Sequence, residues 1–233
     1  MAKISKYKTI FFDLDHTLWD YDRNSLETLT DIHQQYQLYE KYGVGFDKFN
    51  TTFHKVNGAL WDRYNRGELD RNYIKQKRFV TILKKLQVDT CYSSDMSEQY
   101  LNNCPHKPHM MPYTLEVIED LSQKYDLYIL TNGFLDVQQI KLEKTGLKPF
   151  FKGMITSECC GYRKPDKEIF EYSLQLANTC AEDSMMIGDN LDTDVAGAMK
   201  ASIAAVYFNP HQTAHNRTVT HEINCLSELT SIL

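Results

Sequence analysis

Hydrophobic positions follow two different periods along this chain of 233 residues. Beyond Pro112, short apolar runs of strand length alternate with stripes of helical spacing. The runs predict strands at 127–130, 153–156, 184–188 and 203–208. The stripes predict helices at 115–124, 135–145, 166–177 and 193–200. This alternation is typical of a parallel sheet with helices on both faces, so we predict an α/β fold built on a Rossmann-like sheet.

The segment at 20–104 shows helical spacing only, because its apolar residues recur every three or four positions. Amphipathic helices in succession must bury their stripes against one another. We therefore predict a helical domain at 20–104, inserted into a core formed by 1–19 and 105–233. Three prolines between positions 105 and 112 mark the return to the core.

Two acidic residues follow a first apolar run at 7–12, in the sequence Asp13-Leu14-Asp15-His16-Thr17. Burying both carboxylates unpaired would cost on the order of several kcal/mol each, so they require a cation or a reaction. Residues two apart face the same side of a strand. Asp13 is therefore a candidate nucleophile and Asp15 a candidate general acid. The alternative is a helix cap or a solvated loop, where short Asp-rich turns also occur.

Two later segments supply hydrogen-bond donors and a positive charge. Thr131-Asn132-Gly133 follows the strand predicted at 127–130, and a threonine hydroxyl with backbone N–H groups can bind a phosphoryl oxygen. Lys164 precedes the helix predicted at 166–177 and is a point charge suited to phosphate. Taken singly, the first segment is an ordinary turn and the second an ordinary surface lysine.

A third segment, Gly188-Asp189, ends the strand predicted at 184–188, and Asp194 follows it closely. Magnesium takes few carboxylates together with waters and phosphate oxygens, which a pair of Asp13 and Asp189 would match. The alternative is that these acids only complement a helix dipole. Because parallel sheets bind ligands at the carboxyl ends of their strands, these three segments and the segment Asp13–Thr17 together predict one site.

In this order the segments resemble the four motifs of the haloacid dehalogenase (HAD) superfamily of phosphohydrolases. The resemblance implies that Asp13 attacks phosphorus and forms an aspartyl-phosphate. It implies that Asp15 gives a proton to the leaving oxygen and later takes one from water. The resemblance also implies that Thr131 and Lys164 stabilise the phosphoryl group during its transfer.

The resemblance also implies a cofactor and a lid. Magnesium would be held by the Asp13 carboxylate, the Asp15 backbone carbonyl and Asp189, with Asp194 supporting the metal site. The helices at 20–104 resemble a C1-type cap, which closes over the active site, excludes water and selects the substrate. Dehalogenases and phosphonate-cleaving members lack an acid at the position of Asp15, so their chemistry is disfavoured.

Beyond the motifs, the chain resembles the YjjG-like 5'-nucleotidases over nearly its full length, including segments 57–67, 131–134 and 138–147. This resemblance implies a nucleoside 5'-monophosphate as substrate. The aromatic ring of Trp61 is a candidate for stacking on the base. The predicted substrate-binding residues are Thr131, Asn132, Gly133, Lys164 and Trp61.

Three further side chains lie close to these segments. Tyr64 falls in the helical stripe and is expected to pack inside the cap, whereas Trp19 is expected to line the entrance to the site. His16 is placed to tune the proton affinity of Asp15.

Two other functions stay open. Sugar-phosphate mutases keep both acids, so a phosphatase or mutase of another small metabolite, such as phosphoglycolate or a sugar phosphate, is the first alternative. The second is a non-catalytic binding protein on the same scaffold. That hypothesis predicts the loss of at least one catalytic residue, and every one is present in this sequence. The sequence leaves the oligomeric state open.

The composition restricts partners and location. With 42% hydrophobic and 24% charged residues and a net charge of −5, the chain is typical of a globular protein and disfavours a nucleic-acid polymer as partner. Its six cysteines lack CxxC spacing, which indicates free thiols in a reducing compartment. The start, Met1-Ala2-Lys3-Ile4, lacks an apolar leader, and no stretch reaches membrane-spanning length. We therefore predict a cytoplasmic protein without a membrane partner.

Overall fold

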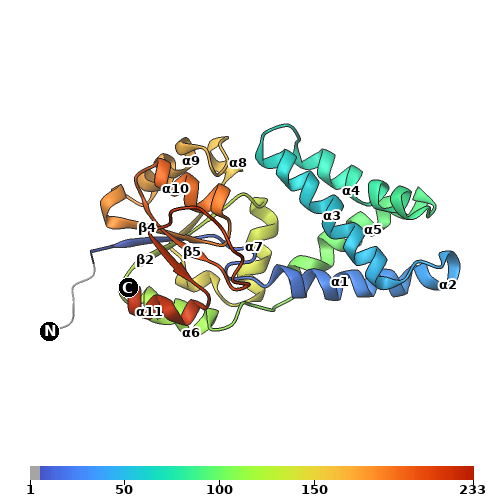
Figure 1. The fold of residues 1–233 in the computed structure, drawn as a ribbon, viewed down its shortest axis with the longest axis horizontal. Coiled ribbons are helices and arrows are strands. Elements are labelled where there is room, and N and C mark those ends of the chain that lie inside the picture. The colour runs from blue at the N-terminus through green and yellow to red at the C-terminus, as the bar shows by residue number, and fades with distance from the viewer. Residues whose placement is uncertain (1–5) are drawn as a thin grey trace. The chain divides into compact units, whose positions relative to one another are not determined.

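The computed structural model describes residues 6–233 (Figure 1). The chain forms two compact units, a core unit of Met1–Tyr21 with Pro108–Leu233 and a helical unit of Asp22–Lys107. The predicted lack of an apolar leader concerns Met1-Ala2-Lys3-Ile4, and these residues lie outside the described ones. The chain enters the helical unit two residues after the predicted boundary and leaves it three residues after the predicted boundary. The two predicted domain boundaries stay predictions.

A parallel sheet forms the centre of the core unit. Its strands are β1 (Thr9–Phe12), β2 (Asp126–Thr131), β3 (Gly153–Thr156), β4 (Ser184–Gly188), β5 (Ala204–Phe208) and β6 (His221–Ile223). They lie in the order β3-β2-β1-β4-β5-β6. Phe12 at the end of β1 pairs with Ile129 of β2 on one side and Ile187 of β4 on the other. The predicted α/β sheet is confirmed, and β1 occupies its middle.

Helices cover both faces of this sheet. They are α6 (Thr114–Ser122), α7 (Leu135–Lys144), α8 (Ser157–Cys160), α9 (Lys167–Leu176), α10 (Ala196–Lys200) and α11 (Leu229–Ile232). In Figure 1, α9 and α10 lie on one face, and α6 and α11 lie on the other. Phe11, Leu130 and Met186 of the strands pack against Phe170 of α9 in a fully buried cluster. This packing explains why the strands read as continuous apolar runs.

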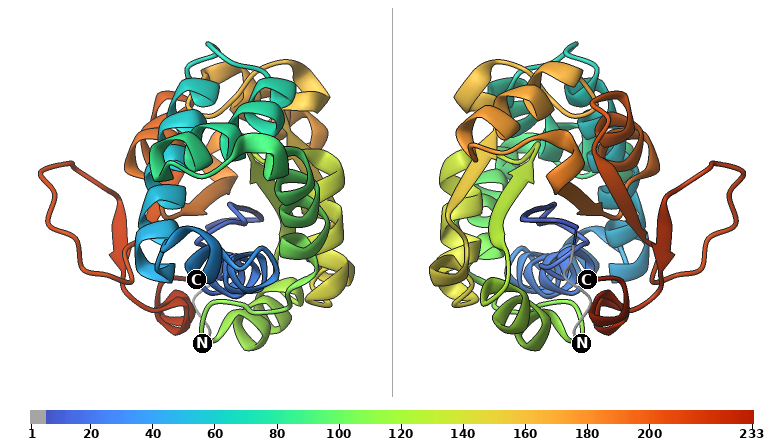
Figure 2. Two further views of the ribbon diagram at one scale, coloured as in Figure 1. Left: turned by 90° about the vertical axis from the view of Figure 1, so that its right-hand side faces the viewer. Right: turned by 90° about the vertical axis from the view of Figure 1, so that its left-hand side faces the viewer.

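Several short elements escape prediction. The strand β6 and the helices α8 and α11 have only three or four residues, too few to show a period. The helix predicted at 193–200 begins with a π-helical turn at Leu191–Val195, because the N–H groups of Asp194 and Val195 both donate to the Asn190 carbonyl. Figure 2 shows the irregular segment between β5 and β6 standing out from the core unit.

The helical unit consists of packed helices. They are α1 (Tyr21–Gln35), α2 (Leu38–Tyr42), α3 (Phe46–Asn65), α4 (Arg71–Leu86) and α5 (Ser93–Asn103). Phe53 of α3, Phe79 of α4 and Tyr100 of α5 meet at ring-centroid distances of 4.9–6.0 Å. The apolar stripes of the sequence therefore face a shared aromatic core, as predicted for successive amphipathic helices. Among the described residues, no helix has the length and apolar character needed to cross a membrane.

Candidate active site

Asp13 lies at the carboxyl end of β1, in contact with a buried lysine. Its N–H donates to the Ile187 carbonyl of β4 at 2.9 Å, which keeps the residue in the sheet. Lys164 Nζ donates to Asp13 Oδ1 at 2.6 Å and to the Leu130 carbonyl at 2.7 Å. The Lys164 side chain is only 2% exposed, so the structure brings these two predicted residues together inside the protein.

Asn132 holds the segment that carries Lys164 through two hydrogen bonds. The Asn132 side-chain amide donates to the Lys164 carbonyl at 2.9 Å, and the Lys164 N–H donates back to Asn132 Oδ1 at 2.8 Å. This reciprocal pair ties the end of β2 to the lysine. The Asn132 side chain, predicted to bind substrate, is thus engaged in positioning Lys164.

Three carboxylates gather around the same point. Oxygens of Asp13, Asp189 and Asp194 lie within 4.8 Å of one another. Asp194 also pairs with Lys164 at 2.6 Å, and Thr17 Oγ1 donates to Asp189 Oδ1 at 3.2 Å. The three acids and one lysine leave an excess of two negative charges when all are ionised.

This excess changes the proton affinities of the cluster. Burial, with repulsion from Asp194 and Asp189, raises the pKa of Asp13 to about 8 although Lys164 opposes the shift. Burial and Asp194 likewise raise the pKa of Asp189 to about 7. Burial disfavours the charged form of Lys164, but Asp13 and Asp194 outweigh it and hold the lysine pKa above its ordinary value. The carboxylates therefore repel one another and would be relieved by a cation.

The donor set of this cluster suits magnesium. Its carboxylate oxygens are hard ligands, and two or three of them leave positions for waters and phosphate oxygens. Gly188 makes the arrangement possible, because a Cβ there would lie 2.3 Å from Asp194 Oδ2. Asp194 can therefore occupy its place in the cluster only with glycine at position 188. The residues present fit a divalent cation, and Asp13 and Asp189 are the predicted ligands among them.

Asp15 has different neighbours, and the sequence did not predict them. Lys141 Nζ donates to Asp15 Oδ1 at 2.5 Å and Gln138 Nε2 donates to Asp15 Oδ2 at 2.8 Å, both from α7. Burial favours the neutral acid, but Lys141 and Gln138 outweigh it and hold the pKa of Asp15 below its usual value, with a smaller effect of His16. Polar residues three apart on an inward helix face were the available sequence signal.

The Lys141 ammonium also lies 4.2 Å from the ring centroid of Trp19. Trp19 is fully buried, so it packs beneath Lys141 and does not line an entrance as we expected. The reason is local: Trp19 closes the loop that begins at Asp15, because its carbonyl accepts the His16 N–H at 3.0 Å.

Thr131 lies at the end of β2 with its hydroxyl oriented by two donors. Its Oγ1 accepts from Gln138 Nε2 at 2.8 Å and from the Gly133 N–H at 3.0 Å. Because both lone pairs are engaged, the hydroxyl hydrogen is available to donate to another oxygen. A Cβ at Gly133 would lie 2.2 Å from Gln138 Nε2, so glycine is needed for the amide to come this close.

Most of the chain, including the four motifs, matches a known family. The haloacid dehalogenase-like hydrolase family matches residues 7–202. The chain belongs to this family. The predicted superfamily is thereby confirmed, and the chain is a hydrolase.

Several relatives of this HAD-like hydrolase cover nearly its full length. The HAD-hydrolase YfnB of Bacillus subtilis is 29% identical over 99% of this chain and 97% of its own. The pyrimidine 5'-nucleotidases YjjG of Escherichia coli and PynA of Streptococcus pneumoniae are both 28% identical, over 98% and 97% of this chain and 98% and 95% of their own. A crystal structure of YfnB bound to magnesium has a TM-score of 0.89 at 28% identity, covering 98% of this chain and 99% of that one. The YjjG-like resemblance is confirmed.

The remaining predicted residue, Trp61, lies in the helical unit of the HAD-like hydrolase. It is half-buried on α3, and its ring meets that of the buried Tyr64 edge-on at 5.2 Å. Tyr64 packs inside the unit as expected. The role of Trp61 in stacking on a base stays a prediction.

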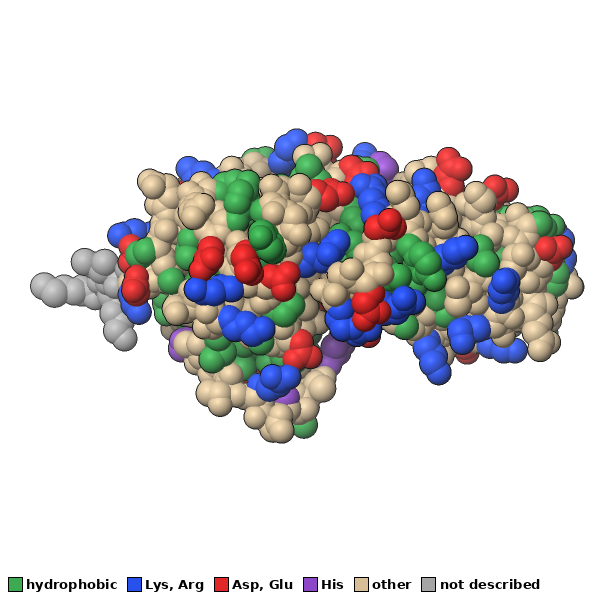
Figure 3. All heavy atoms as spheres, turned by 90° about the horizontal axis from the view of Figure 1, so that it is seen from above, with side chains coloured by type: hydrophobic (Ala, Val, Ile, Leu, Met, Phe, Trp, Pro, Cys, Tyr) green, Lys and Arg blue, Asp and Glu red, His purple; other side chains and the backbone are tan. Residues whose placement is uncertain are grey.

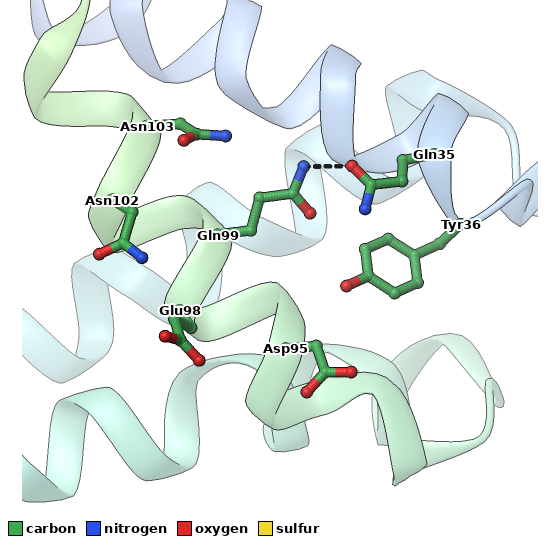
Figure 4. Close-up of a pocket in the computed structure, with 7 residues that line it drawn as sticks. All are labelled: Gln35, Tyr36, Asp95, Glu98, Gln99, Asn102 and Asn103. Carbon is green, nitrogen blue, oxygen red and sulfur yellow. Dashed lines mark hydrogen bonds between the residues drawn. The ribbon is translucent and has the colours of Figure 1, made fainter.

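The helical unit also carries an open hollow of about 450 Å³ between α1 and α5 (Figure 4). Polar side chains line it: Gln35, Tyr36, Asp95, Glu98, Gln99, Asn102 and Asn103. Gln99 Nε2 donates to Gln35 Oε1 at 2.6 Å across the hollow. None of the predicted site residues belongs to this lining.

Proposed function

We propose that this HAD-like hydrolase is a magnesium-dependent phosphatase that acts on nucleoside 5'-monophosphates through an aspartyl-phosphate on Asp13. One observation carries the proposal: Asp13 lies 2.6 Å from a buried lysine and within 4.8 Å of two further carboxylates. This arrangement suits a nucleophile that must meet a phosphate group beside a cation. Two relatives named as pyrimidine 5'-nucleotidases support the choice of substrate.

The first half-reaction transfers phosphate to the protein. A carboxylate oxygen of Asp13 bonds to phosphorus while the bond from phosphorus to the 5' oxygen breaks. Asp15 gives its proton to that oxygen, and the nucleoside leaves as an alcohol. Asp15 is able to hold this proton because a bound phosphate brings negative charge near it and raises its proton affinity.

The second half-reaction restores the enzyme. Asp15, now ionised, takes a proton from water while the water oxygen bonds to phosphorus and the bond to Asp13 breaks. Inorganic phosphate is released, and both residues return to their starting forms. Thr131 and Lys164 donate hydrogen bonds to the phosphoryl oxygens in both steps.

The metal site is part of the proposal. Asp13 and Asp189 would hold magnesium with the Asp15 backbone carbonyl, and Asp194 would support the site through its pair with Lys164. When bound, magnesium neutralises phosphate charge that would otherwise repel the nucleophile. The raised pKa values of Asp13 and Asp189 indicate how strongly the cluster lacks positive charge.

The substrate is a small phosphorylated metabolite in this proposal. In Figure 3, acidic and basic side chains are interspersed over the left-hand part of the drawn face, and basic ones are more frequent on the right. The net charge of −5 disfavours a nucleic-acid polymer as partner. The helical unit would act as the cap that selects the leaving group, with Trp61 as the candidate contact to a base. A sugar-phosphate or phosphoglycolate phosphatase would use the same Asp13 and Asp15 chemistry.

The test is phosphate release from nucleoside monophosphates, sugar phosphates and phosphoglycolate, with magnesium and with EDTA. Asp13→Asn is the inactive variant, and Asp192→Asn is the matched control because Asp192 is exposed and pairs with Arg217. We expect metal-dependent release concentrated on nucleotides, lost in the first variant and kept in the second. Release mainly from sugar phosphates would overturn the substrate, and no release from any compound would overturn the phosphatase itself.

A further inference from the structure

We propose that Lys141 is a positioning residue that aims the Asp15 carboxyl at the leaving oxygen, with Gln138 as its partner on the same helix. The inference rests on the proposed function, because Asp15 needs aiming only if it gives a proton to a leaving group. Neither Lys141 nor Gln138 belongs to the four motifs.

The geometry leaves Asp15 little freedom. Lys141 and Gln138 stand three residues apart on α7, so they project from one face of the helix. Each holds a different oxygen of Asp15, at 2.5 Å and 2.8 Å. A carboxyl group held at both oxygens cannot rotate about its last bond, so the direction in which it can give a proton is fixed. The Asp15 side chain is still 26% exposed, so one side remains open to a substrate.

Lys141 is itself fixed in place. Its side chain is 7% exposed, and its ammonium lies between the Asp15 carboxylate and the Trp19 ring, 4.2 Å from the ring centroid. Asp15 and Trp19 are the two ends of one tight loop. The lysine therefore connects α7 to both ends of the loop that carries the proton donor.

Gln138 adds a link to the phosphate-binding hydroxyl. Its amide Nε2 donates to Asp15 Oδ2 and to Thr131 Oγ1, at 2.8 Å in each case, which uses both amide hydrogens. Gln138 is fully buried. One rigid amide thus fixes the distance between the Asp15 carboxyl and the Thr131 hydroxyl. In-line phosphoryl transfer requires such fixed positions.

A purely structural role for Lys141 makes a different prediction from a positioning role. Lys141→Met leaves Asp15 without its charged partner and is expected to lower stability, but any loss of structure would impair every substrate alike. A positioning role impairs only those substrates whose leaving oxygen needs a proton. The leaving-group dependence therefore separates the two.

The experiment compares two substrates on Lys141→Met with magnesium present. The leaving group of a nucleoside monophosphate is a basic alkoxide, which needs a proton. The leaving group of p-nitrophenyl phosphate is a stable phenolate, which does not. We measure kcat/KM, which reports only the steps up to the aspartyl-phosphate. General acid catalysis is worth about 10²–10⁴-fold, so we expect a fall of about 100-fold or more for the nucleotide and of less than about fivefold for p-nitrophenyl phosphate.

The ratio of the two constants does not depend on how much of the variant is folded. Lys144→Met is the matched control, because Lys144 is exposed on the same helix, and it should leave the ratio unchanged. Lys141→Gln, which keeps a donor without the charge, should shift the ratio in the same direction by less. Equal losses on both substrates, or no loss, would overturn the positioning role. A wild-type protein that cleaves neither substrate would instead overturn the proposed function beneath it.

Discussion

The two carboxylates that begin the site stand two residues apart and have opposite surroundings. Asp13 faces two further carboxylates within 4.8 Å, and its pKa is raised to about 8. Asp15 faces Lys141 and Gln138, and its pKa is lowered. One loop therefore carries one acid in surroundings with an excess of negative charge and one acid whose charge is balanced by a lysine.

The difference arises from elements far apart in the sequence. The acids around Asp13 come from the segment after β4, whereas the donors around Asp15 come from α7, which follows β2. Because β1 lies between β2 and β4, its carboxyl end receives side chains from both neighbours. The role of each carboxylate is decided by the neighbouring strand and not by the residue next to it.

The largest expected effect comes from removing the only lysine of the Asp13 cluster. Lys164→Met should lower phosphate release by about 10²–10³-fold, because it removes a preorganised positive charge from the transferring group. It should also lower the free energy of unfolding by about 3–5 kcal/mol, because buried carboxylates lose their partner. Lys167→Met, on an exposed lysine paired with Glu171, is the control for both measurements. Activity within threefold of wild type would contradict the assignment.

The comparison is tested most directly by making the same substitution at both acids. In EDTA at pH 7, Asp13→Asn should raise the free energy of unfolding, because it replaces a buried acid that folding must protonate. Asp15→Asn should lower the free energy of unfolding, because Lys141 loses its charged partner. We expect changes on the order of 1–3 kcal/mol, of opposite sign, in urea denaturation. Two shifts of the same sign would show that the surroundings do not differ as described.

The pH dependence of stability sharpens the same contrast. Asp13 and Asp189 have folded pKa values of about 8 and 7, above the usual value of 3.8. The folded state therefore binds more protons than the unfolded state, and metal-free stability should fall as pH rises from about 4 to 8. We expect a fall on the order of 1–3 kcal/mol per pH unit, steepest below about pH 7 where both groups contribute, measured by denaturation in EDTA.

Magnesium should reverse that loss, with the larger stabilisation at pH 8 than at pH 5. The Asp15 contribution has the other sign, because a lowered pKa gives stability that is lost as pH falls through it. Asp15→Asn should therefore leave the fall between pH 4 and 8 in place, whereas Asp13→Asn should reduce it. A free energy of unfolding in EDTA that stays constant from pH 4 to 8 would contradict the described repulsion among the carboxylates.

The smallest effect is expected at Gly133. Gly133→Ala would place a Cβ 2.2 Å from Gln138 Nε2, and the amide would move away from Asp15 and Thr131. Because the displaced group is the end of a side chain, stability should fall by only about 1 kcal/mol. The nucleotide should lose a few-fold more kcat/KM than p-nitrophenyl phosphate. Gly58→Ala, where a Cβ meets nothing within 4 Å, is the control.

The Asp13 region could be predicted from the sequence and the Asp15 region could not. Asp13, Thr131 and Asp189 each follow a buried strand, and strand ends of a parallel sheet meet at one edge. Lys141 and Gln138 lie inside a helix, where a polar residue is ordinarily a solvated one. Only the packing of α7 turns them inward, and that packing depends on long-range pairing of β1 with β2.

The fold shows the same division. Long apolar runs predicted five strands of the sheet, and helical stripes predicted the longer helices. The short β6 and α11 were missed because a few residues hold no period. The burial of Trp19 was missed for another reason, since it depends on the tight loop that Trp19 closes with Asp15 and His16.

The central place of β1 has a consequence for how the protein folds. Strand β1, which leads into Asp13, can pair only after β2 and β4 have been synthesised. β2 follows the whole helical unit, and β4 follows much of the core as well. Contacts within the helical unit join neighbouring helices and close short loops, so that unit is expected to form first. The Asp13 carboxylate would then be among the last groups to reach its final surroundings during synthesis.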